Sequence, residues 1–195
     1  YYTLLQREYR FQQNKYQLRP IAVPIHFLRM RPGNFPTVRL AQLGVLLYQS
    51  DSIFSKIKET RSLEELKQFF DITANDYWHY HYSFDESSPY KPKKLGSVML
   101  DNIIINTICP LLFAYGSYHQ EQEYKDRAIQ WLEQTTAESN SITRGFMQLG
   151  VANKNAFDSQ ALIELKQAYC EKKRCLECAV GTSLLRSQES GVGSR

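Results

Sequence analysis

The chain has 195 residues, enough to bury one hydrophobic core, so we expect a single helical domain over residues 1–186. Its 43% hydrophobic and 23% charged residues exclude a disordered chain, except at the polar end SQESGVGSR (187–195), which we expect to be a disordered tail. The net charge of +4 is uneven: residues 1–40 hold seven basic groups against one acid, a charge of +6, and the rest of the chain sums to −2.

The first residues, YYTLLQREYR (1–10), lack the apolar run and the basic leader of a secretory signal, which indicates a cytoplasmic protein. They open directly on a helical pattern without a starting Met, so we interpret the chain as a piece of a longer protein. A helix is predicted over 2–18, where apolar residues recur at helical spacing. The two prolines of 18–24 predict an extended or turn-like segment.

A second helix is predicted over 34–50, with Asn34 as its cap and Pro36 in its first turn. Apolar residues surround this helix almost completely, which is typical of the central helix of a bundle. A third helix is predicted over 62–70 (SLEELKQFF), because its Ser and Glu have the spacing of a capping box.

The aromatic run YWHYHYSF (77–84) fits either a short strand or part of a helix, and ESSPYKPKK (86–94) is predicted to be a loop. A second buried helix is predicted over 97–115, bent near Pro110. Its apolar run, IIINTICPLLFAY (103–115), is too short to cross a bilayer, so we expect no contact with a membrane.

Three further segments show helical patterns: an amphipathic one within 118–135, a short one over 141–150, and one over 158–170 that starts with an Asp or Ser cap. Neither an internal repeat nor a Gly-rich phosphate loop occurs. The sequence therefore predicts an all-α fold, an irregular multi-helix bundle that includes either a short β-hairpin or an extended aromatic segment.

A candidate site for an anion lies in FLRMRPGNFPTVRL (27–40). Its proposed ligands are Arg29, Arg31, Asn34 and Arg39, because arginines beside a helix N-terminus suit the phosphate of a nucleic acid. Three alternatives stay open: the arginines pin this proline-rich loop, pair with acids of an upstream part, or solvate one face.

The aromatic run supplies a second candidate surface. On a strand, Trp78, Tyr80, Tyr82 and Phe84 share one face, with two histidines on the other. Such rings stack on nucleic-acid bases, and the lysines of 91–94 follow closely. The alternative is an aromatic edge of the core.

Three cysteines are clustered in YCEKKRCLEC (169–178): Cys170, Cys175 and Cys178, spaced C-x4-C-x2-C. This is half of a metal-binding signature and fits a structural zinc, with Cys109 or a histidine as the fourth ligand. An iron–sulfur cluster fits less well, because the small-residue loop expected around it is missing. The alternatives are three reduced thiols packed as small hydrophobes, or a redox role.

No catalytic pattern is recognisable, since the sequence has no H-E-x-x-H, no G-x-S-x-G and no P-loop. Its scattered carboxylates cannot be paired from the sequence alone. We therefore expect no catalytic activity from this segment.

Four segments carry a family resemblance: RPGNFPTVRLAQL (31–43), YWHYHYSF (77–84), NTICPLLFAYG (106–116) and DSQALIELKQAYCEKKRCLECAVG (158–181). With them the chain resembles, over nearly its whole length, a bacterial family called domain of unknown function two-eight-five-one. The resemblance implies that this chain is a helical C-terminal half, and that an upstream half carries a pattern similar to the PD-(D/E)xK nuclease core. The clustered cysteines belong to the resemblance, which implies no established activity.

Two hypotheses of function follow. The first is a helical accessory domain of a nuclease-like protein that binds nucleic-acid phosphate through the arginine loop. The second is a structural or oligomerisation module stabilised by a metal on the three cysteines.

Overall fold

The computed structural model describes residues 1–25, 27 and 31–183. In these ranges the chain forms ten α-helices and no strand, so the all-α prediction is confirmed and the β-hairpin alternative has no counterpart there. Contacts divide the chain into two compact units, Tyr1–Leu100 and Asp101–Arg195, hereafter unit 1 and unit 2. The predicted disordered tail, 187–195, lies outside the described residues.

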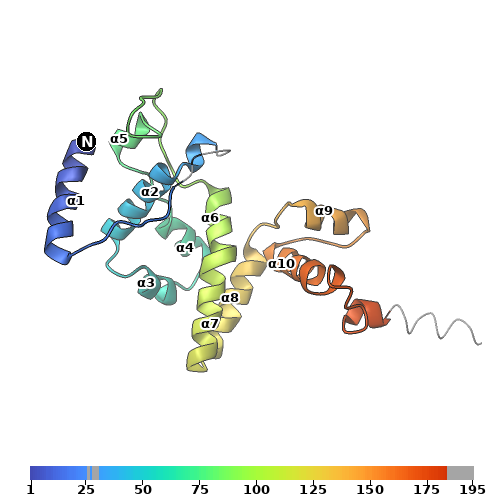
Figure 1. Cartoon of the computed structure of the whole chain (residues 1–195). Coiled ribbons are helices and arrows are strands. Elements are labelled where there is room, and N and C mark those ends of the chain that lie inside the picture. The colour runs from blue at the N-terminus through green and yellow to red at the C-terminus, as the bar shows by residue number, and fades with distance from the viewer. Residues whose placement is uncertain (26, 28–30, 184–195) are drawn as a thin grey trace, which may run out of the picture. The chain divides into compact units, whose positions relative to one another are not determined.

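Unit 1 contains several short helices joined by irregular segments (Figure 1). In chain order they are α1 (Tyr2–Tyr16), the 3₁₀ turn η1 (Pro32–Asn34), α2 (Pro36–Gln49), α3 (Ile53–Glu59), α4 (Leu63–Phe69), α5 (Asp76–His79) and the start of α6 (Ser97–Ile103). One cluster of its core consists of Val38, Ala74 and Trp78, with aromatic side chains packed around it.

Local capping explains where two of these helices begin. Ser62 accepts a hydrogen bond from the Glu65 backbone N–H (3.2 Å), as predicted for α4. The helix α3 was not predicted, although the Ser52 hydroxyl caps it by accepting from the Ser55 N–H (3.3 Å). Its seven residues are too few to show a clear helical period.

The prediction that Asn34 caps α2 is wrong. Residues 32–34 form the 3₁₀ turn η1, so Phe35 becomes the N-cap, without a side-chain bond to the helix. Pro36 does occupy the first turn, as predicted. The Asn34 side-chain oxygen Oδ1 instead accepts from the Arg39 guanidinium.

The prediction that α2 is the central helix of a bundle is also wrong. Only Val38, Gln42 and Leu46 are buried, whereas Leu47 is exposed and Tyr48 is 92% exposed. The helix α1 has no buried residue at all. The two longest helices within unit 1 therefore leave apolar side chains in contact with solvent in this structure.

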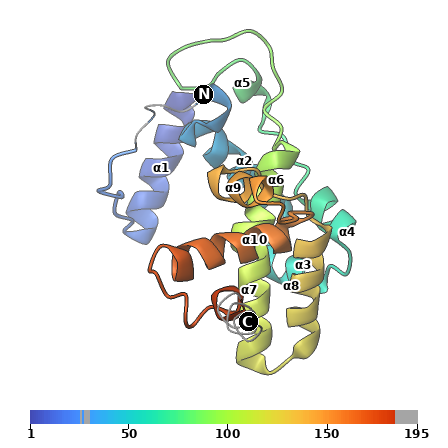
Figure 2. The ribbon, with the colours of Figure 1, turned by 90° about the vertical axis from the view of Figure 1, so that its right-hand side faces the viewer.

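Unit 2 is built around a helical hairpin. The helix α6 passes through the π-helical turn η2 (Ile104–Ile108) into α7 (Cys109–His119), and α8 (Gln122–Gln134) runs back beside α7 (Figures 1 and 2). The remaining elements are α9 (Ser141–Gln148), α10 (Ala156–Glu164) and the π-helical turn η3 (Leu165–Cys170). The predicted Asp or Ser cap at 158–159 is wrong, because α10 begins at Ala156 and Asn155 caps it.

The π-helical turn lies just before Pro110, the second residue of α7. A proline has no N–H and its ring crowds the carbonyl four residues earlier, so a wider turn at this point relieves the clash. The helical run continues through the proline from Ser97 to His119.

This continuous helix, Ser97–His119, has 23 residues, and an 18-residue stretch of it has a mean hydropathy of 1.6, so it meets the length and composition of a membrane-crossing helix. The prediction that the region is too short is therefore wrong about its length, because 103–115 is only part of the helix. Ile104, Ile108 and Leu112 are buried within the protein, however, and a core helix passes the same test. One such helix among the described residues is weak evidence for a membrane span.

Gly116 allows α7 and α8 to approach closely. A Cβ at this position would lie 2.8 Å from the Glu121 carbonyl oxygen and 3.0 Å from the Tyr124 Cβ, so the backbone would have to move. We expect Gly116→Ala to lower the free energy of unfolding by about 1–3 kcal/mol, measured by urea denaturation.

The matched control is Gly145→Ala in α9, where a Cβ meets nothing within 4 Å. Since alanine favours a helix interior over glycine, this variant should gain about 0.5–1 kcal/mol. Equal stability of the two variants would contradict the close approach at Gly116.

Candidate functional site

The arginine loop is only partly described. Arg29 lies outside the described residues, whereas Arg31 and Asn34 are exposed and Arg39 is half-buried. Arg39 donates through Nη1 to Gln42 Oε1 (2.8 Å) and through Nη2 to Asn34 Oδ1 (2.5 Å), and burial lowers its pKa. Asn34 and Arg39 are thus brought together, but their hydrogen bond stabilises the turn at residues 32–34. Of the described arginines of the predicted anion site, Arg31 is the one that is exposed.

A polar chain connects this turn to the aromatic run. Gln42 is buried and donates through Nε2 to the Lys93 carbonyl oxygen (2.9 Å), which also accepts from the Ala74 N–H (3.0 Å). The arginine loop and the aromatic run, which are separate in sequence, are therefore adjacent within unit 1.

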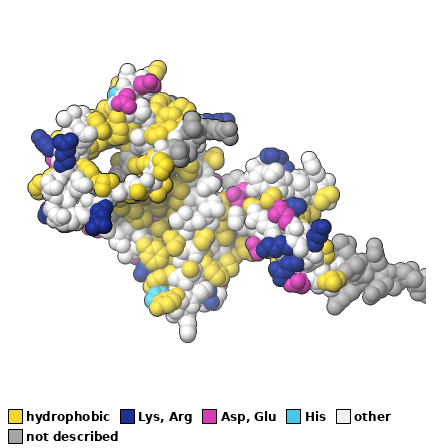
Figure 3. Space-filling view, in the orientation of Figure 1, with side chains coloured by type: hydrophobic (Ala, Val, Ile, Leu, Met, Phe, Trp, Pro, Cys, Tyr) yellow, Lys and Arg dark blue, Asp and Glu magenta, His cyan; other side chains and the backbone are white. Residues whose placement is uncertain are grey.

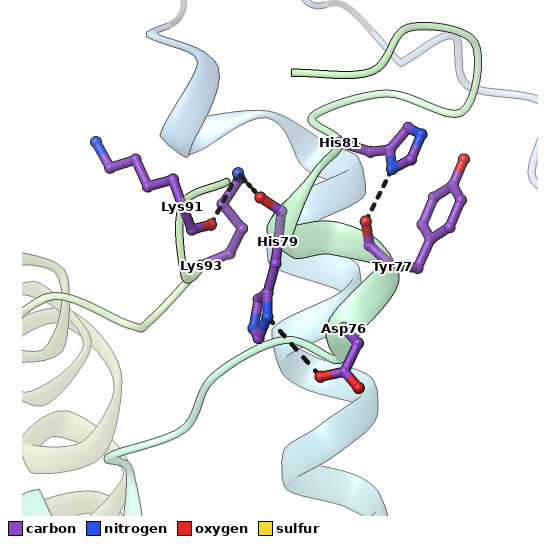
Figure 4. A network of polar contacts seen from close by, with 6 residues as sticks. All are labelled: Asp76, Tyr77, His79, His81, Lys91 and Lys93. Carbon is purple, nitrogen blue, oxygen red and sulfur yellow. Dashed lines mark hydrogen bonds and ion pairs between the residues drawn. The ribbon is translucent and has the colours of Figure 1, made fainter. Parts of the chain in front are cut away.

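Lys93 is the residue that sequence reasoning missed. Its side chain is buried, with the whole residue 4% exposed, and Nζ donates to the carbonyls of Lys91 (3.0 Å) and His79 (3.3 Å) (Figure 4). Nζ also lies 3.9 Å from the centre of the Tyr82 ring. Burial, and secondly the positive charge of Lys91, lower the pKa of Lys93.

The lysines of the 86–94 loop consequently differ in role. Lys94 pairs with Asp71 (2.9 Å) and Lys93 is buried, so only Lys91 is an exposed cation without a carboxylate partner in the described part of the loop. No sequence signal indicated that Lys93 is buried, because the alternation of Lys93 and Leu95 with exposed neighbours appears only in the structure.

The aromatic run does not alternate as a strand, so that reading is wrong. Its first residues belong to α5, which buries Trp78 and leaves Tyr80 exposed. The Tyr77 ring is stacked between His81 (centroids 4.0 Å apart) and Tyr1 (4.1 Å). The His81 Nδ1 lies 2.8 Å from the Tyr77 carbonyl oxygen and donates to it (Figure 4).

Two exposed tyrosines lie beside Lys91. Tyr80 and Tyr90 are half-exposed or more, and their ring centroids are 5.3 Å apart. Solvent-facing rings next to an exposed cation are a surface suited to stacking with a base of a polyanion.

An apolar groove of about 480 Å³ opens between α1 and α2. In Figure 3 hydrophobic side chains surround a hollow beside α1. It is lined by Tyr1, Leu5, Thr37, Leu40, Ala41, Gly44, Val45, Tyr48, Asn75, Trp78 and Phe84. Sequence reasoning missed this groove because its walls come from four separate segments.

The first helix adds exposed positive charge to unit 1. Arg7, Arg10 and Lys15 of α1 are all exposed, and Figure 3 shows separate dark blue side chains around this helix. In the described part of residues 1–40 the one ion pair is Arg7 with Glu8 at 3.6 Å. The charge of this segment is therefore not neutralised within the described structure.

The three clustered cysteines are not gathered into a metal site. Cys170 and Cys175 are exposed and Cys178 is buried, and the described residues contain no group of three or more His, Cys, Asp or Glu able to hold a metal ion. Cys109 is buried in α7, where burial raises its thiol pKa to about 12. A cysteine-bound zinc thus stays a prediction for which the structure provides no assembled ligand set.

The comparison with protein families gives a match. The model of a family described as "Protein of unknown function (DUF2851)" matches residues 1–141. Three of the four segments that carry the resemblance, 31–43, 77–84 and 106–116, lie inside this match, and the cysteine segment 158–181 lies outside it. No curated protein and no solved structure matches the chain.

Proposed function

Because the chain belongs to the family of unknown function DUF2851, whose description assigns no activity, we propose a function from the surface of unit 1: it binds the phosphates of a single-stranded nucleic acid. Exposed cations of residues 1–40 contact the phosphates, and exposed tyrosines stack on bases. The sequence resemblance adds that this binding would serve a nuclease-like half of the same protein.

The proposal is carried by exposed arginines that have no acidic partner, or only a distant one. Arg10 and Arg31 are exposed and have no acidic partner among the described residues, and Arg7 has only the long contact to its neighbour. Exposed charges of one sign repel one another, and a polyanion relieves that repulsion while releasing its own counterions.

The arginine turn has a supporting part in this proposal. Arg39 is held by Asn34 and Gln42, so it fixes the 3₁₀ turn that follows Arg31 and does not itself contact phosphate. We assign Arg39 a positioning role and Arg31 a contact role.

The exposed Tyr80 and Tyr90 favour a single-stranded nucleic acid over a duplex. Tyr80 and Tyr90 offer ring faces to solvent, and an unpaired base is able to stack on such a face whereas a paired base is not. The exposed Lys91 beside them suits the adjoining phosphate.

The test is the salt dependence of binding to a labelled oligothymidylate, followed by fluorescence anisotropy. Replacing Arg7, Arg10 and Arg31 together by alanine should weaken binding and reduce the slope of log K against log salt by about 2, since each phosphate contact to a single strand contributes about 0.7.

The control replaces three exposed lysines of unit 2, Lys154, Lys172 and Lys173, by alanine, which removes the same charge. This variant should keep the wild-type slope. The proposal fails if the intact chain does not bind the oligonucleotide at low salt, or if both triple variants lose the same slope.

A further inference from the structure

The groove between α1 and α2 has an aromatic wall. Trp78 and Phe84 meet at 5.2 Å between ring centroids, and Tyr1 lies edge-on to Trp78 at 6.2 Å. Leu40 and Val45 of α2 line the same groove. A groove lined by aromatic and aliphatic side chains suits a planar ring.

Asn75 provides a side-chain amide in this mostly apolar lining. It occupies the N-cap of α5, yet its side chain makes no capping bond there. Its Nδ2 donates instead to the Tyr1 hydroxyl (3.1 Å), and in the described part of the chain its Oδ1 accepts no hydrogen bond. A side-chain amide with a free acceptor is a group that reads the edge of a nucleobase.

Gly44 keeps the groove open. It lies inside α2, where glycine weakens a helix, and a Cβ there would meet nothing within 4 Å. Packing within the described structure therefore does not require glycine at this position. What its missing side chain preserves is space in the groove.

From these features we propose that the groove binds one unpaired nucleobase of a single strand, with its ring against the partly exposed Tyr1 and Phe84, behind which the buried Trp78 lies, and its edge at Asn75. The inference rests on the proposed function and names the subsite that this function uses. The strand that leaves the groove across α1 meets the exposed Arg7 and Arg10, so the surroundings carry the charge that a polyanion needs. An uncharged aliphatic ligand would use neither the rings, the amide nor these cations.

The experiment uses the full chain with Trp131→Phe, which leaves Trp78 as the sole tryptophan and makes it a reporter of the groove. The probes are an oligothymidylate and an abasic strand of the same length. The wild-type groove should bind the base-bearing strand more tightly, and only that strand should quench Trp78 fluorescence.

Gly44→Leu fills the groove while placing a better helix former in α2, and far-ultraviolet circular dichroism of the variant separates a loss of binding from unfolding. We expect it to weaken oligothymidylate binding roughly 5-fold to 150-fold, the range for losing one stacked base. Binding of the abasic strand and the salt slope should not change. The matched control is Gly145→Leu in α9, whose Cβ also meets nothing within 4 Å and which should bind as wild type does.

The outcomes separate this inference from the function on which it rests. Equal, salt-dependent binding of both strands, or unchanged binding by Gly44→Leu, overturns the base subsite and leaves phosphate binding standing. Binding of neither strand overturns both. If sedimentation shows a dimer that Gly44→Leu dissociates, the groove is an interface between two copies of the chain, and the base subsite is overturned.

Discussion

Replacing Trp131 by alanine is expected to lower the free energy of unfolding of unit 2 by about 3–5 kcal/mol. Trp131 is 1% exposed on α8, the helix that packs against both α7 and α10. Removing its indole leaves a cavity that the surrounding helices cannot fully close. Since a domain of this size is stable by only about 5–15 kcal/mol, the loss would be a large share of the total.

The same variant also shows whether the two units unfold together. With Trp131 absent, Trp78 is the one tryptophan, and its fluorescence reports on unit 1 while far-ultraviolet circular dichroism reports on all helices. Coincident urea transitions would agree with the prediction of a single domain over 1–186, whereas an earlier dichroism transition would indicate two independently folding units.

Trp131→Phe is the control for ring size. It keeps most of the buried apolar area and should lose clearly less stability than the alanine variant. A Trp131→Ala protein as stable as the wild type would contradict the buried position of this side chain.

Segments with strong local signals could be predicted from the sequence. The Ser62 cap and the apolar spacing behind it define α4, and the stripe of Ala128 and Trp131 defines α8, because both depend on neighbours within one or two turns. The α7–α8 pairing could not be predicted, since it depends on Gly116, whose role appears only once α8 is adjacent.

Two of the errors arise because the burial of a segment depends on tertiary contacts that a local pattern does not contain. The apolar surroundings of α2 indicated a central helix, but the structure leaves Tyr48 in solvent beside an open groove. The aromatic run alternates in sequence, yet it begins as α5 because Trp78 packs on Val38 and Ala74.

The candidate site was predicted in part. The basic character of residues 1–40 and the exposure of Arg31 agree with the sequence pattern, whereas Arg39 is occupied with Asn34. Neither the groove nor the buried Lys93 could be found from spacing, because each depends on segments far apart in the chain.

Lys93 gives the second large expected effect. We expect Lys93→Ala to lower the free energy of unfolding of unit 1 by about 1.5–3 kcal/mol, because hydrogen bonds from a charged donor to two carbonyls and the contact with Tyr82 are lost. Lys93→Met retains the apolar stem and removes the buried charge, so it should lose less. Urea unfolding followed through Trp78 fluorescence in a Trp131→Phe background measures both variants.

The pH dependence of the same residue has a definite sign. Burial lowers the pKa of Lys93 in the folded chain below the ordinary value of 10.5, so between these two pKa values the unfolded chain holds more protons than the folded chain. The stability contributed by Lys93 therefore rises with pH across that window and is lowest below the folded pKa. Taking the difference in unfolding free energy between wild type and Lys93→Met cancels the titration of other groups, and this difference should grow as the pH approaches 10.5. A difference that stays constant, or that falls, would mean that the amine is hydrated in solution and that its hydrogen bonds to the Lys91 and His79 carbonyls do not persist there.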